Sequence, residues 1–136
     1  MRTEPGDHEH AIARFMSVVG GVDWTMCRAL LDERLPGAVA QAVKDADTFF
    51  GLELPALAEW AFGPEQASAI RCPVLSVLGA ETQPLWVEVA AFLRSFVPDV
   101  EERVIEGVGH LLHIQRAQPV ARAMADFLGR NSMTGD

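Results

Sequence analysis

Four histidines are the residues of this 136-residue chain whose type and spacing first suggest chemistry. They lie in two pairs, His8 and His10 near the N-terminus and His110 and His113 near the C-terminus. Histidine is a common zinc ligand, and because its ordinary pKa lies near neutrality it also transfers protons in catalysis. The surroundings of each pair decide which of these chemistries it can support.

Neither pair has the spacing of a zinc site. The segment HEH at 8–10 departs from the His-Glu-x-x-His pattern, because Ile12 stands where the second histidine belongs. Residues two apart on a helix also point to different sides of it. His110 and His113 are three apart and can share a helical face, but no third ligand is near them in the sequence. We therefore expect no metal.

The composition limits the classes of partner. The net charge is −8 and the basic residues are not clustered, which argues against nucleic acid. No apolar run approaches the roughly 20 residues of a membrane span, and the N-terminus lacks the apolar stretch of a signal peptide, so we expect a cytoplasmic protein. Cys27 and Cys72 lie in apolar contexts and are expected to be buried thiols rather than a disulfide.

Up to about residue 63 the apolar spacing is helical throughout. Asp7 and Asp23 are placed to cap two helices, and Pro36 and Pro55 fit the first turns of two more. The segment FGP at 62–64 is a breaker. The first half of the chain is therefore predicted to be all helical.

After the breaker, segments that resemble strands and helices alternate. PVLSVLG at 73–79 is a short apolar run between Pro and Gly, which is typical of a strand buried on both faces. A helix from Pro84 that ends before Pro98, a second strand and turn at 103–110, and a last helix from Pro119 complete the pattern. This order predicts parallel strands joined by right-handed connections.

These motifs resemble the end of the α/β-hydrolase fold: the strand PVLSVLG, a helix, a second strand ending in GVGH, and then LLHIQRAQPVARAMADFL. The resemblance covers nearly the whole chain and is closest from Cys72 to Leu128. It implies an α/β protein in which residues 1–66 form a helical cap. Residues 67–136 would be the last two strand–helix units of the parallel sheet.

The resemblance assigns the catalytic histidine to His110. In that role it is the general base that takes a proton from the nucleophile and later returns it to the leaving group. Gly107 and Gly109 would let the loop turn tightly and present the imidazole beyond the strand end. The alternative is a surface histidine in a loop.

The catalytic acid is harder to place. The family pattern usually has Asp about three residues after the glycine that ends the strand, and here Thr82 occupies that position after Gly79. Glu81 is one residue away and is the candidate acid. In some members of the family the acid follows the preceding strand, which would lie upstream of this chain.

The resemblance also implies a substrate pocket beneath the cap. Phe49, Phe50 and Trp60 are candidates to line it, with His113 at its rim. Core packing is the competing interpretation, because aromatic residues at helical spacing are usually core. Phe49 and Phe50 are adjacent and point in different directions, which leaves one of them able to face a pocket.

No serine or cysteine has the Gly-x-Ser-x-Gly context of the family's nucleophile. We therefore interpret the chain as a partial α/β-hydrolase that is inactive by itself. Its parent would hydrolyse a small apolar substrate, in the first place an ester, without a cofactor; epoxide, carbon–carbon and haloalkane hydrolysis remain open. The alternative is a non-catalytic binding or dimerisation module.

Two parallel strands are marginally stable by themselves, and an apolar strand with a free edge recruits another strand. We therefore expect either a homo-oligomer or association with a missing N-terminal half.

Overall fold

The structure is a computed structural model that describes residues 5–131. The chain forms two compact units, Met1–Ala61 and Phe62–Asp136, which we call the N-terminal and C-terminal units. The sequence prediction had set the boundary between residues 66 and 67. Each unit is described by itself.

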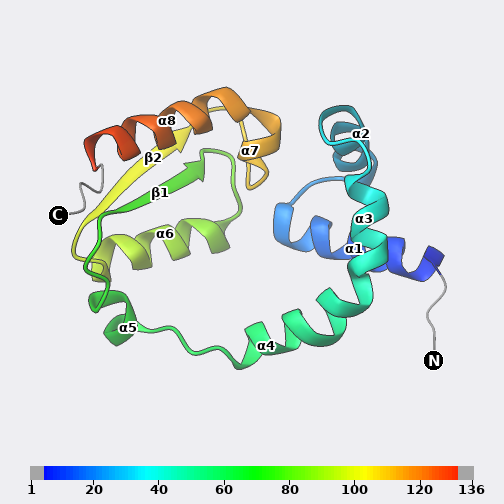
Figure 1. The fold of residues 1–136 in the computed structure, drawn as a ribbon, viewed down its shortest axis with the longest axis horizontal. Helices are drawn as coiled ribbons and strands as arrows, with labels where there is room; N and C mark the ends of the chain where they lie inside the picture. The colour runs from blue at the N-terminus through cyan, green and yellow to red at the C-terminus, as the bar shows by residue number, and fades with distance from the viewer. Residues whose placement is uncertain (1–4, 132–136) are drawn as a thin grey trace. The chain divides into compact units, whose positions relative to one another are not determined.

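The N-terminal unit is helical within its described residues. Its first three helices are α1 (Pro5–Gly20), α2 (Trp24–Arg34) and α3 (Ala38–Thr48) (Figure 1). The Asp23 carboxylate accepts a hydrogen bond of 3.2 Å from the Met26 amide and caps α2, as the sequence predicted. Asp7 lies inside α1, so its predicted role as a cap is wrong.

A π-helical turn, η1 (Phe49–Glu53), follows α3 without a break and leads into α4 (Leu54–Glu59). The Leu54 amide donates to the Phe49 carbonyl, a spacing of five residues instead of the four of an α-helix. Turns of this kind are rare and are often found at functional sites. Here the turn holds Phe49 and Phe50.

The C-terminal unit contains the sheet (Figure 1). Its elements are α5 (Pro64–Ser68), β1 (Val74–Gly79), α6 (Pro84–Phe96), β2 (Val100–Ile105), α7 (Leu112–Gln115) and α8 (Ala117–Arg130). The two strands pair in parallel, from Val74 opposite Val100 to Gly79 opposite Ile105. Both strands therefore end at the same edge of the sheet.

Helices α6 and α8 lie on opposite sides of the two strands (Figure 1). Ile105, Val108 and Leu112 form a buried cluster, against which Val77 and Val120 pack. The parallel strands and alternating helices confirm the predicted α/β class.

Charged residues in β2 are held by the flanking helices. Glu101 accepts two hydrogen bonds of 2.7 Å from Arg130 of α8. Glu102 accepts bonds of 3.0 and 2.9 Å from Arg94 of α6. Because neighbouring residues of a strand point to opposite faces, this pattern agrees with helices on both sides.

Several sequence predictions are corrected. The second strand, Val100–Ile105, begins three residues before the predicted start at Arg103, and the last helix begins at Ala117, two residues before Pro119. The breaker opens the short helix α5. Cys72 is exposed, because it lies in the irregular segment before β1, whereas Cys27 is buried as expected.

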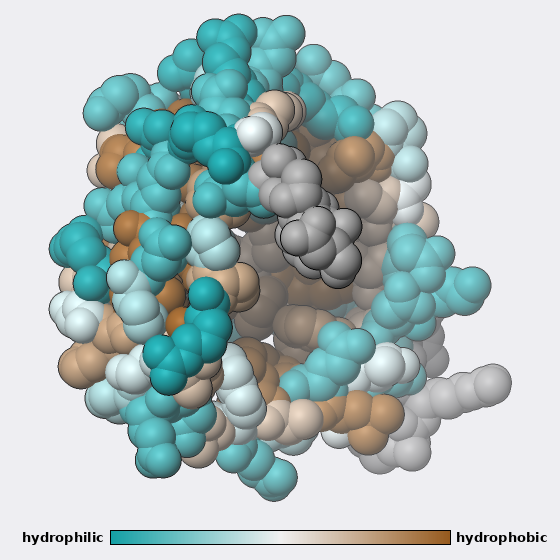
Figure 2. All heavy atoms as spheres, turned by 60° about the vertical axis from the view of Figure 1, so that its left-hand side comes forward, coloured by the Kyte–Doolittle hydropathy of each residue, from teal (hydrophilic) through white to brown (hydrophobic). Residues whose placement is uncertain are grey.

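Apolar side chains reach the surface of both units. Leu52, Trp60 and Leu128 are all more than half exposed. On the face drawn in Figure 2, apolar side chains lie between polar ones. No described residue with a large side chain is fully buried.

Among the described helices, none has the length and apolar character needed to cross a membrane.

Candidate active site

The loops that follow β1 and β2 lie side by side and are joined by backbone hydrogen bonds. The Ala80 amide donates to the Ile105 carbonyl and the Glu81 amide to the Val108 carbonyl, both at 2.9 Å. The two loops therefore meet at the carboxyl ends of the two parallel strands. In open α/β sheets this edge is where ligands bind.

Two glycines allow this close approach. A Cβ atom on Gly79 would lie 2.2 Å from the Gly109 carbonyl oxygen and 2.4 Å from that of Val108, so only glycine fits. Gly107 has a φ of 72°, in the left-handed region that favours glycine. These two backbone constraints therefore fix the position of the residue that follows Gly109.

That residue is His110, which is half-buried. Its imidazole stacks on the indole of Trp86, with the ring centroids 3.9 Å apart and an angle of 6° between the planes. Burial, and secondarily the charge of His113, lower the pKa of His110 below its ordinary value. The neutral imidazole is therefore favoured, which is the form that a general base needs.

The structure places the two candidates for the acid position differently. Glu81 is exposed, and within the described chain no hydrogen bond or ion pair joins its carboxylate to His110. Its backbone instead contacts the other loop. The Thr82 hydroxyl is buried and has no hydrogen-bond partner among the described residues. A buried hydroxyl without a partner is unusual, and this one stands where the family pattern places its acid.

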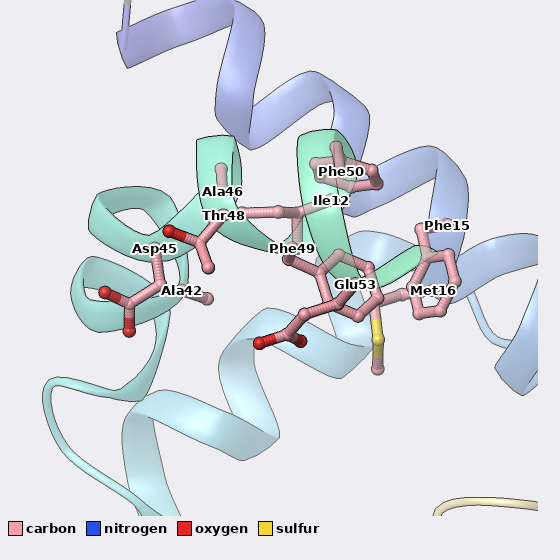
Figure 3. Close-up of a pocket in the computed structure, with 10 residues that line it drawn as sticks. All are labelled: Ile12, Phe15, Met16, Ala42, Asp45, Ala46, Thr48, Phe49, Phe50 and Glu53. Atoms are coloured by element: carbon pink, nitrogen blue, oxygen red, sulfur yellow. The ribbon is translucent and has the colours of Figure 1, made fainter. Parts of the chain in front are cut away.

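Of the four predicted pocket residues, three belong to the N-terminal unit and His113 belongs to the C-terminal unit. Phe49 and Phe50 line a cavity of about 420 Å³ in the N-terminal unit (Figure 3). Trp60 is 64% exposed and lies outside the lining of that cavity. His113 belongs to the C-terminal unit and lines a separate apolar groove beside α8, of about 490 Å³.

The cavity of the N-terminal unit is formed by α1, α3 and η1 (Figure 3). Phe15, Phe49 and Phe50 make edge-to-face contacts in it, with centroids 5.0 Å apart for Phe15 and Phe49 and for Phe49 and Phe50. Asp45 and Glu53 add two carboxylates to the lining. Such a site suits a small, largely apolar molecule.

Two of the described serines, Ser68 and Ser95, are engaged within their own helices. The hydroxyls of Ser68 and Ser95 donate to helix carbonyls one turn earlier, at 2.7 and 2.8 Å. Ser132 lies outside the described residues. Cys27 belongs to the N-terminal unit, and burial raises the pKa of its thiol, which disfavours the reactive thiolate.

The described residues contain no group of three His, Cys, Asp or Glu side chains that could hold a metal ion. The Nε2 atom of His8 instead lies 3.1 Å from a carboxylate oxygen of Asp47 in α3.

Trp86 is the residue of this site that sequence reasoning did not assign. It lies in the first turn of α6, which Pro84 begins. The sequence offered a signal for Trp86. The first turn of a helix that follows one strand lies beside the loop that follows the neighbouring parallel strand.

Comparison with known proteins gives one match. No protein-family model and no curated protein matches the chain. In a comparison with solved structures, the chain is similar to a His-tagged serine hydrolase involved in carbazole degradation, the CarC enzyme, with a TM-score of 0.60 and 19% identity. The match covers 89% of this chain and 47% of that one. The chain therefore has the fold of part of an α/β-hydrolase and spans about half the length of the hydrolase that it matches.

Proposed function

We propose that this chain supplies the general base, His110, to an α/β-hydrolase whose nucleophile lies on a segment outside this sequence. One observation carries the proposal: the His110 loop lies against the β1 loop, at the carboxyl ends of parallel strands in a hydrolase-like fold. Acyl transfer needs a base at such an edge, beside a nucleophile and oxyanion donors.

In the proposed reaction, His110 takes the proton of a serine hydroxyl as the oxygen attacks an ester carbonyl. It then gives that proton to the departing alcohol, and the same steps with water release the acid. The lowered pKa of His110 keeps the imidazole neutral before each cycle. The cavity lined by Phe49 and Phe50 in the N-terminal unit has a size that suits a small, largely apolar molecule. The roles predicted for Glu81, Trp60 and His113 stay predictions.

The decisive experiment begins with the genomic sequence upstream of the Met1 codon. We expect an in-frame segment there with Gly-x-Ser-x-Gly or Gly-x-Asp-x-Gly. The chain joined to that segment should hydrolyse a short p-nitrophenyl ester, and His110→Ala should abolish the turnover. The 136-residue chain alone should show only background hydrolysis. Turnover that survives His110→Ala would refute the role of His110.

A second function, as an association module, is favoured by a different observation. The structure pairs β1 with β2 alone, and Leu52, Met124 and Leu128 expose half or more of their surface. Strand edges and apolar patches of this kind recruit partners. We propose self-association of the isolated chain, which light scattering after size-exclusion chromatography at micromolar concentration would reveal. A monomer peak with one sharp thermal transition would contradict it.

A further inference from the structure

We propose that Trp86 is a positioning residue for His110: its indole holds the plane of the imidazole and stabilises the imidazolium that forms when His110 accepts a proton. This proposal rests on the proposed function, because the plane of the ring matters for catalysis only if His110 transfers a proton.

The geometry of the contact supports this role. The centroids lie 3.9 Å apart and the planes differ by 6°, so the rings overlap face to face. Neutral aromatic pairs prefer offset or edge-to-face arrangements with centroids roughly 4.5–7 Å apart. A cation over an indole face is attracted by the ring quadrupole, and tryptophan is the best aromatic partner for it. The arrangement therefore suits the imidazolium better than the neutral imidazole.

Both rings stand on segments whose backbones are fixed. The Trp86 amide donates to the Gln83 carbonyl at 3.0 Å in the first turn of α6. On the other side, the Gly109 amide donates to the side-chain oxygen of Gln115 at 3.3 Å. Because the loops themselves are joined by the bond from Glu81 to Val108, the two rings keep their relative position without a side-chain hydrogen bond between them.

The other candidates for this role are not engaged. In a catalytic triad a carboxylate orients the histidine and stabilises its charged form. Glu81 is exposed and forms no hydrogen bond or ion pair with His110 in the described chain. His113, the other titratable group near His110, opposes the protonated form. The indole of Trp86, by contrast, contacts the imidazole directly and can favour the imidazolium.

The test is a pH titration of the histidine ring protons by NMR in the full 136-residue chain and its variants. In the wild type, the ring protons of His110 should be shifted upfield by the indole. Trp86→Leu keeps an apolar cover but removes the aromatic face. It should abolish that shift and lower the pKa of His110 by roughly half a unit. Trp86→Phe should keep part of both effects, and Phe96→Leu, at the other end of α6, should change neither.

Two outcomes would overturn the proposal. One is a wild-type spectrum without the upfield shift, which remains decisive even if Trp86→Leu fails to fold. The other is a pKa of His110 that is the same in the wild type, Trp86→Phe and a folded Trp86→Leu. Because these readouts do not require hydrolysis, they separate failure of the positioning role from failure of the proposed function.

Discussion

The two units build their sites in different ways. In the N-terminal unit the cavity is made by side chains, above all Phe15, Phe49 and Phe50, on continuous helices. In the C-terminal unit the position of His110 is set by backbone contacts between two loops, with Gly79 packed against the carbonyls of Val108 and Gly109. A side-chain site can absorb substitutions by repacking, whereas a site made by contacting backbones cannot. The two units should therefore respond differently to small changes.

The largest effect is expected for Gly79→Ala. The added methyl would overlap two carbonyl oxygens, so the loops would have to separate, and we expect a loss of about 3 kcal/mol or more in the free energy of unfolding. Urea denaturation followed by circular dichroism measures this. Gly129→Ala in α8 is the matched control, because a Cβ there meets nothing within 4 Å, and it should be neutral or slightly stabilising. Equal midpoints for the two variants would show that the two loops accommodate a side chain at Gly79.

A smaller loss is expected for Phe49→Ala in the N-terminal unit. Phe49 is half-buried and packs edge to face against Phe15 and Phe50, so we expect a cost of about 2 kcal/mol. Leu52→Ala, in the same π-helical turn but 68% exposed, should cost little. Equal losses of stability in the two variants would contradict the role of the aromatic contacts of Phe49.

Two of the three described glycines with positive φ sharpen the comparison further. Gly107 (φ 72°) precedes the His110 loop, and Gly37 (φ 88°) precedes α3. A Cβ atom on either glycine would meet nothing within 4 Å, so alanine should cost each about 1–2 kcal/mol through backbone strain alone. Only Gly107→Ala should weaken the stacking of His110 on Trp86, as reported by the ring-proton shifts. Equal displacement of His110 by both substitutions would argue against local control.

The smallest effect concerns pH. Because the folded pKa of His110 lies below its unfolded value, the unfolded chain binds the extra proton more readily. The stability linked to His110 is present above the unfolded pKa and is lost as pH falls through the folded pKa, that is, below about 6.5. His110→Gln should therefore flatten the fall in stability between about pH 7 and 5. Glu101, whose pKa Arg130 holds below its ordinary range, contributes only at lower pH. A wild type and variant that change in parallel would show that His110 is not the group responsible.

The sequence predicted the parts of the fold that depend on local pattern. The run at 73–79 corresponds to β1, and Pro84 begins α6 as expected. The start of β2 was missed because Glu101 and Glu102 look unsuited to a strand between two helices. The arginines that pair with these two carboxylates, Arg130 and Arg94, come close to β2 only when the chain is folded.

The candidate site was predictable to a similar extent. The spacing of glycines around His110 predicted a loop at a strand end, because tight turns have a local signature. The contact with Trp86 joins residues 24 positions apart, and its geometry depends on how α6 leaves β1. The exposure of Glu81 likewise depends on the fold. The backbone of Glu81, and not its side chain, contacts the loop that follows β2.

The π-helical turn η1 has a consequence for chain length. The bond from Leu54 to Phe49 spans one residue more than an α-helical bond, as if a single residue had been inserted into a continuous helix. Deleting Gly51 would restore regular α-helical spacing and rotate everything beyond it by about 100° around the axis. Leu54 and Leu57 of α4 would then point in new directions while Phe15 and α1 stayed in place. The N-terminal unit should thus tolerate replacement of Gly51 by alanine far better than its removal, and related chains that retain the Phe49–Phe50 cavity should keep the same number of residues between α3 and α4.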